Sequence, residues 1–76
     1  MNIQEKVKQI VASVCDVAVE NVTLNSAIGD FPAWDSMGNL AILQQVEVEF
    51  GIQFNPKEMM TIEDVNDIVR AVEEKL

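Results

Sequence analysis

Apolar residues recur at intervals of three and four positions in three separate stretches of this 76-residue chain. This spacing lines one face of an α-helix, whereas a half-buried strand needs strict alternation of apolar and polar residues. Only residues 51–54 are ambiguous between the two patterns. The first stretch, residues 3–15, carries Ile3, Val7, Ile10, Val11 and Val14. The spacing therefore predicts an all-α fold.

A second helix is expected from Asp35 to Phe50. Pro32 disfavours helix before it, and Asp35 is a good N-cap because its carboxylate can accept hydrogen bonds from the free amides that follow. Gly51 suits the left-handed turn that ends many helices. On a helical wheel, the residues expected to face the core are Leu40, Ile42, Leu43, Val46 and Phe50.

The C-terminal part of the sequence predicts a short helix and a longer one. Pro56 suits the first position of a helical turn that extends to Met60. Thr61 is expected to cap the last helix, with Glu63 and Asp64 in its first turn, where the helix dipole favours acid. The expected buried stripe of this helix contains Val65, Ile68, Val69, Val72 and Leu76.

The connection between the first two helices, residues 16–34, is longer than most loops of compact domains. Its apolar residues indicate that it packs against the core: Val19, Val22, Leu24, Ile28 and Phe31. The expected fold is thus a small all-α bundle of three main helices plus one short helix, with a long first loop. We expect one domain over residues 1–76.

Net charge excludes some classes of function. The chain has 13 acidic and 5 basic residues, a net charge of −8, and this repels a nucleic-acid backbone. Solubility alone explains such acidity, and steering of basic partners is the functional alternative. No apolar run approaches the roughly 20 residues of a membrane span, and residues 1–6 do not resemble a signal peptide. A cytoplasmic protein is expected.

The chain contains no histidine, the commonest general base and metal ligand. Neither an enzyme nor a metal site is therefore expected. The calcium-binding loop pattern of acidic residues ending in glutamate is also missing from the sequence. The single cysteine, Cys15, cannot form an internal disulfide and is expected to be a small buried residue.

Ser36 follows the expected cap and begins the second helix. Unpaired amides and the positive end of the helix dipole favour a phosphate ester at such a position. The alternative is a serine that only caps the helix. A serine nucleophile of an enzyme is disfavoured, because no histidine is present to activate it.

The second helix carries another apolar stripe on the side away from its core face. Its members are Met37, Ala41 and Val48, with Gln44 among them. Scattered apolar residues are normal on protein surfaces, and a docking face for partner proteins is the alternative. Glu47 and Glu49 lie in the last turn, where the helix dipole disfavours anions. No Lys or Arg of this helix offsets them, which suggests contacts with cationic surfaces elsewhere.

Trp34-Asp35-Ser36-Met37, at the start of a helix, resembles the Asp-Ser-Leu/Met attachment motif of acyl carrier proteins. Residues 47–52, Glu-Val-Glu-Phe-Gly-Ile, look like the acidic end of the second helix in that family. The resemblance covers essentially the whole chain, including its length, acidity, long first loop and order of helices. A lone tripeptide would be a weak signal, but this one stands at the start of the second of four expected helices.

The resemblance implies a non-catalytic carrier. A phosphopantetheinyl transferase would attach 4'-phosphopantetheine from coenzyme A to Ser36, beside Asp35, and the arm would hold acyl or aminoacyl groups as thioesters. Further partners would be an activating ligase, an acyltransferase or a ketosynthase with a basic surface, and the chain would be a monomer. The expected partner-binding residues are Trp34, Met37, Gly38, Ala41, Gln44, Glu47 and Val48. An acyl chain is expected near Leu43, Val46, Met59 and Ile62.

Three positions differ from the carriers of fatty acid synthesis. Gly38 and Ala41 stand where those carriers usually have acid, and glycine costs up to about 1 kcal/mol of helix propensity, which favours a packing or access reason. Trp34 is more like stand-alone carriers with dedicated ligases, D-alanyl carriers among them. Its ring would either fold over the first loop or contact partners. These differences favour a specialised lipid, polyketide or acyl-modification pathway over housekeeping fatty acid synthesis. An acidic protein-interaction module with no prosthetic group is the alternative of another class.

Overall fold

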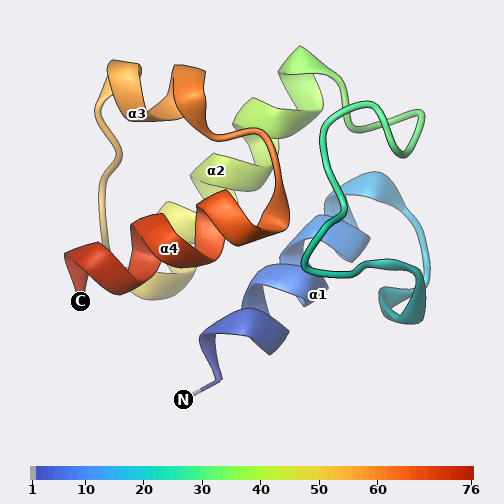
Figure 1. Ribbon diagram of the computed structural model, residues 1–76, viewed down its shortest axis with the longest axis horizontal. Coiled ribbons are helices and arrows are strands. Elements are labelled where there is room, and N and C mark those ends of the chain that lie inside the picture. Colours follow the sequence, from blue (N-terminus) through green and yellow to red (C-terminus); the bar gives the residue numbers. More distant parts are fainter. Residues whose placement is uncertain (1) are drawn as a thin grey trace.

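The computed structural model describes residues 2–76, and the arrangement of its helices is shown in Figure 1. Helix α1 spans Ile3–Cys15, α2 spans Ser36–Phe50, α3 spans Pro56–Thr61 and α4 spans Val65–Lys75. A single 3₁₀ turn, η1, spans Val19–Asn21 in the first loop. The expected all-α fold, with three main helices and one short one, is confirmed. In Figure 1, α2 begins at the end of the molecule away from both chain termini.

Both ends of α2 lie where the sequence predicts them. The Asp35 carboxylate accepts a hydrogen bond from the Gly38 amide at 2.8 Å, so Asp35 is the N-cap. Gly51 ends the helix with a φ of 65°, in the left-handed region that favours glycine. Local capping chemistry therefore fixes where this helix starts and where it stops.

The expected start of the last helix is wrong. Thr61 is the final residue of α3, where its hydroxyl donates to the Glu58 carbonyl oxygen at 3.0 Å. Asp64 caps α4 instead, since its carboxylate accepts from the Asp67 amide at 2.7 Å. Glu63 and Asp64 consequently precede the helix. The reason is Ile62, which is extended and buried and so breaks the helical path after Thr61.

The core lies where α1 packs against α2 and α4. Its buried apolar residues come from α1, α2, α4 and the connecting segments: Val7, Val11, Ala12, Cys15, Val22, Trp34, Ile42, Leu43, Val46, Phe54, Ile62, Val65, Ile68, Val69 and Val72. The prediction of burial is wrong for two residues. Leu40 is 46% exposed, and Leu76, which follows the last helical residue, is 64% exposed. Phe50 is half-buried against the core.

The first loop packs against the core as expected, with Val22 buried and Val19, Leu24, Ile28 and Phe31 half-buried. It is also hydrogen-bonded to the α3–α4 connection and to the first residue of α4. The Ile28 amide donates to the Glu63 carbonyl oxygen at 2.8 Å, and the Val65 amide donates to the Ser26 carbonyl oxygen at 3.0 Å. These bonds hold the loop and the α3–α4 connection together beside the start of α2.

Cys15 is buried at the end of α1, as expected, and burial raises the pKa of its thiol. Within residues 2–76, no helix is both long enough and apolar enough to span a membrane. In the same part of the chain, no three His, Cys, Asp or Glu side chains are grouped so that they could hold a metal ion.

Candidate functional site

Ser36 is the first residue of α2, and its side chain is exposed. The cap of the helix is Asp35, so the alternative in which Ser36 serves as the capping residue is wrong. Ser26 makes a useful contrast, because it is only 6% exposed and its hydroxyl accepts from the Thr23 amide at 2.9 Å. The Ser36 hydroxyl is therefore open to an enzyme that approaches the end of α2.

The start of α2 suits an anion. Asp35 takes the amide of Gly38, the third helical residue, and leaves the amides of Ser36 and Met37 outside its capping bond. The first turn of α2 contains no acidic residue. The positive end of the helix dipole is thus offset only by the cap itself, and a phosphate on Ser36 would lie next to free amides.

Gly38 has a packing reason, as expected. A Cβ atom at this position would overlap the carbonyl oxygen of Ala33 and would come within 3.1 Å of the Ala33 carbonyl carbon. The chain that leads into α2 crosses directly over the first turn, and only glycine leaves room for it. Gly38 therefore sets how closely the Asp35 cap approaches the helix.

Trp34 is fully buried, so the expectation that its side chain binds partners is wrong. The ring folds over the first loop and stacks on Phe31, with 6.4 Å between the ring centroids and 12° between their planes. Its indole N–H donates to the Asn39 side-chain oxygen at 3.0 Å. This satisfies the polar atom that a buried tryptophan brings into a core.

Asn39 connects three parts of the fold and was missed by the sequence analysis. Its side-chain amide accepts from Trp34 and donates to the Ile62 carbonyl oxygen at 3.0 Å. We call this pair of hydrogen bonds the Asn39 bridge. A signal did exist, because positions 39, 42, 43 and 46 share one helical face and a buried Trp34 needs an acceptor.

A groove of about 420 Å³ runs beside Ser36, between α2 and α3. We call it the Ser36 groove. Its apolar lining is Ile28, Leu40, Met59, Met60 and Ile62, and its polar lining is Ser36, Asn39 and Glu63. Of the four residues expected around an acyl chain, Met59 and Ile62 do line it. Leu43 and Val46 do not, because both are fully buried in the core.

The comparisons with known proteins agree with this geometry. The family described as "Phosphopantetheine attachment site" matches residues 5–72. The acyl carrier protein of Petrotoga mobilis is 32% identical over 72 residues, which is 95% of this chain and 85% of that protein. The acyl carrier protein of Rickettsia bellii is 27% identical over 73 residues, covering 96% of this chain and 85% of that protein.

The chain belongs to the acyl carrier protein family. It is a carrier and not an enzyme, and its prosthetic group is 4'-phosphopantetheine. The residues present fit that group, since an exposed hydroxyl stands at a helix N-terminus whose first turn lacks acid, beside a groove. When attached, the arm supplies a terminal thiol that holds an acyl group as a thioester.

The side of α2 that faces away from the core is exposed at most of the positions expected to bind partners. Met37 is 79% exposed and Val48 is 80% exposed; Gln44 is exposed and Ala41 is half-buried. Leu40 extends this side toward the Ser36 groove. We call these five residues the outer face of this carrier's α2.

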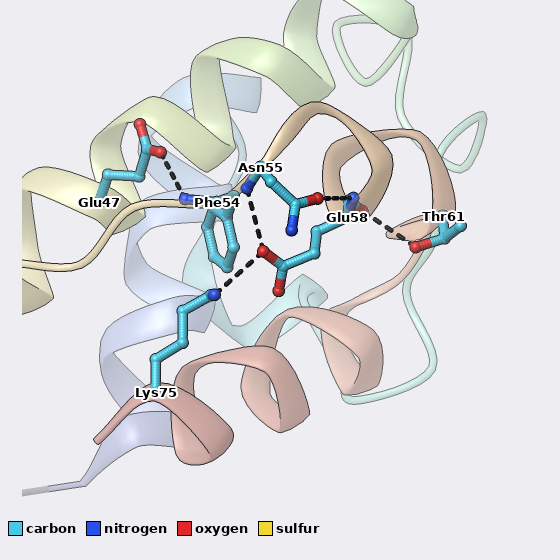
Figure 2. Close-up of polar contacts among 6 residues, drawn as sticks. All are labelled: Glu47, Phe54, Asn55, Glu58, Thr61 and Lys75. Atoms are coloured by element: carbon cyan, nitrogen blue, oxygen red, sulfur yellow. Dashed lines mark hydrogen bonds and ion pairs between the residues drawn. The ribbon is translucent and has the colours of Figure 1, made fainter.

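The two carboxylates at the end of α2 have partners inside the molecule. Glu47 accepts a hydrogen bond from the Phe54 amide at 2.8 Å (Figure 2), and Glu49 pairs with Lys6 of α1 at 3.2 Å. The interpretation that these acids lack compensation is therefore wrong. Glu47 is half-buried and ties α2 to the segment that leads into α3, so its role as a partner-binding residue is not supported.

Helix α3 forms one side of the Ser36 groove and contains no buried residue. It is held by polar contacts, which Figure 2 shows. Asn55 and Glu58 form a reciprocal capping box, with bonds of 2.7 Å and 3.0 Å. Glu58 also pairs with Lys75 of α4 at 2.9 Å, and the Lys75 ammonium lies 5.8 Å from the centre of the Phe54 ring.

The Glu58 contacts should be visible in a pH titration. The Asn55 amide, followed by Lys75, holds the pKa of the Glu58 carboxyl below its usual range. The carboxylate therefore stabilises the fold above the usual pKa, and this contribution is lost as the pH falls through the lower, folded-state value. We expect the nuclear magnetic resonance shift of the Asn55 amide proton to titrate with a midpoint below the usual glutamate value.

Lys75→Met should move this midpoint upward, toward the usual value. Lys8→Met removes the same charge from α1, where Lys8 faces Glu5, and should leave the midpoint unchanged. A native midpoint at or above the usual value would contradict the bracing of α3 by Glu58.

Proposed function

We propose that Ser36 receives the phosphopantetheine arm and that the outer face of α2 presents the loaded arm to partner enzymes. The observation that carries this proposal is the exposed Ser36 hydroxyl at the N-terminus of α2, with Asp35 as the cap and the Ser36 groove alongside. The proposal covers one carrier domain over residues 1–76.

The attachment reaction needs little from the carrier beyond presentation. Ser36 Oγ would form a bond to the phosphorus of the phosphopantetheine while the pyrophosphate bond of coenzyme A breaks. Adenosine 3',5'-bisphosphate would be the leaving group, and the hydroxyl proton would pass to the transferase. The chain has no histidine to accept that proton, which supports a base supplied by the enzyme. The free amides of Ser36 and Met37 would then stabilise the phosphate ester.

Partner enzymes would recognise both the negative charge of the carrier and the exposed apolar side chains of its outer face. A net charge of −8 favours fast encounter with basic surfaces. Met37 and Val48 offer exposed apolar contacts on either side of Gln44. We propose an activating ligase, acyltransferase or ketosynthase with a basic surface as the user of this face, in addition to the phosphopantetheinyl transferase.

The pathway is proposed to be a specialised one rather than housekeeping fatty acid synthesis. Gly38 and Ala41 leave the front of α2 without the acid that the carriers of fatty acid synthesis usually have there. Trp34 no longer supports this proposal as a partner contact, because its ring is buried. The carrier is proposed to act as a cytoplasmic monomer. In support of this, its one cysteine is buried and forms no disulfide, as is usual for proteins of the reducing cytosol.

Intact mass spectrometry tests the attachment site. Incubation with coenzyme A and a broad-specificity phosphopantetheinyl transferase should add the mass of one phosphopantetheine to the native chain and nothing to Ser36→Ala. Ser13→Ala is the matched control, since Ser13 is also exposed but lies in the body of α1, and it should be modified like the native chain.

Circular dichroism should show that all three chains are folded before the masses are compared. A folded native chain that remains unmodified would contradict the proposal and favour an interaction module without a prosthetic group. Modification of Ser36→Ala would place the arm on another residue.

A further inference from the structure

The floor of the Ser36 groove is closed by a buried polar group. Asn39 lines the groove, yet it is only 7% exposed and lies between the groove and the core of the bundle. Directly along the same helical face lie Leu43 and Val46, both fully buried. A chain that entered the core from Ser36 along this face would have to displace the Asn39 side chain.

Displacing Asn39 would break hydrogen bonds on both of its sides. Its oxygen accepts from the Trp34 indole at 3.0 Å and its nitrogen donates to the Ile62 carbonyl oxygen at 3.0 Å. The indole belongs to a fully buried ring, so its N–H could not turn to water instead. Leaving a buried donor or acceptor unpaired carries a desolvation penalty that an alkyl chain cannot offset with a hydrogen bond.

The lining of the groove is partly charged and partly exposed to solvent. Its rim carries the Glu63 carboxylate, which an alkyl chain would have to desolvate or avoid. Of the two methionines that α3 contributes to the groove, Met60 is 83% exposed and Met59 is half-buried, so this side of the groove is open to solvent at Met60. An acyl chain lying in this groove would therefore stay at the surface, partly in contact with water, and outside the apolar core.

We infer that Asn39 determines the specificity of this carrier by sealing the core, so that the arm holds a short or polar acyl group outside the bundle and not a long alkyl chain within it. This inference rests on the proposed attachment to Ser36. It assigns the carried group to the size class of an amino acid or a short carboxylic acid. The Asn39 bridge acts through position and makes no bond to the arm.

The test compares loaded chains of different acyl length. A broad-specificity transferase supplied with acetyl-, butyryl- or octanoyl-coenzyme A should produce the three loaded carriers, checked by intact mass. We expect their thermal unfolding midpoints to agree within about 2 °C, whereas burial of an octanoyl chain would raise the midpoint by more than about 5 °C. The methyl resonances of Leu43 and Val46 should be the same in all three.

A double variant should open the floor of the Ser36 groove toward the core. Trp34→Phe with Asn39→Leu replaces both members of the Trp34–Asn39 hydrogen bond with apolar groups, so no indole N–H is left unpaired, although the Ile62 carbonyl oxygen loses its donor. In this variant the octanoyl-loaded form should unfold at a higher temperature than the acetyl-loaded form and should shift the Leu43 and Val46 resonances. Gln45→Leu, an exposed amide on another side of α2, is the matched control and should behave like the native chain.

Three outcomes are decisive. Native carriers that load but become more stable with chain length overturn the inference and leave the proposed function standing. Native carriers that do not load with any acyl-coenzyme A contradict the proposed function itself. A double variant that folds but gains no stability from an octanoyl chain overturns the role given to Asn39, and if it does not fold, the three native carriers still test whether the core is sealed.

Discussion

Gly38→Ala should lower the stability of this carrier by at least about 2 kcal/mol, although alanine is a better helix former by about 1 kcal/mol. The new methyl group would overlap the Ala33 carbonyl oxygen, a backbone atom that no side-chain rotation can move away. Either the segment before α2 or the first turn of the helix must shift. A loss of this size is a large fraction of the free energy of unfolding of a small domain.

The same substitution should slow the modification of Ser36. Ala33 is two residues from Asp35, and a shift of that segment would move the carboxylate that accepts the Gly38 amide at 2.8 Å. The helix would then begin less regularly, and Ser36 would no longer stand in a fixed place at its end. We expect the initial rate of phosphopantetheine attachment to fall together with the urea midpoint.

Gly51→Ala is the matched control. A Cβ at Gly51 would meet nothing within 4 Å, but its φ of 65° disfavours alanine by about 1–2 kcal/mol. It should therefore lower stability at the far end of α2 and leave the rate of Ser36 modification unchanged. A Gly38→Ala chain as stable as the native one would show that the approach of Ala33 to the helix is not a constraint.

The boundaries of α2 could be predicted because their causes are local. Asp35 caps an amide three residues away, and Gly51 adopts the left-handed turn in its own backbone. The start of α4 could not be decided in this way, since Thr61 and Asp64 are both capping residues. The choice depends on Ile62, which is drawn into the core, and on the bond from the Ile28 amide to Glu63, 35 positions along the chain.

In the candidate site, too, features with a local cause could be predicted and features that depend on distant residues could not. The position of Ser36 at the start of α2 and the packing reason for Gly38 could be predicted, because a helix N-terminus and a costly glycine are local signals. Asn39 was missed, since the pattern puts the apolar Leu40 inward and cannot show that Trp34 and Ile62 supply partners for a buried amide. The acids at the end of α2 were misread for a similar reason.

Glu47 and Glu49 have partners that lie outside their own helix. Glu49 is paired with Lys6, a residue 43 positions earlier, and Glu47 accepts an amide from beyond the end of its own helix. Reading α2 alone makes both look uncompensated. Charge placement within one helix therefore indicates a partner surface only after contacts with the rest of the chain have been counted.

Trp34→Ala should destabilise this carrier more than any other single substitution considered, by about 3–5 kcal/mol. The ring is fully buried, stacks on Phe31 and occupies the junction of the first loop with α2. Trp34→Phe keeps an aromatic ring there but removes the indole N–H, which leaves the Asn39 oxygen without its donor. That loss should be smaller, about 1–3 kcal/mol.

Chemical unfolding followed by circular dichroism gives both differences on one scale. Trp34 is the only tryptophan of the chain, so native fluorescence should show the short-wavelength emission of a buried indole and should move to longer wavelength on unfolding. Met37→Ala is the contrasting variant. Met37 is 79% exposed on the outer face, so this change should alter stability little. If Trp34→Ala were as stable as the native chain while its transfer to partner enzymes failed, the indole would be a contact surface after all, and the Asn39 bridge would lose the buried donor on which the sealed core depends.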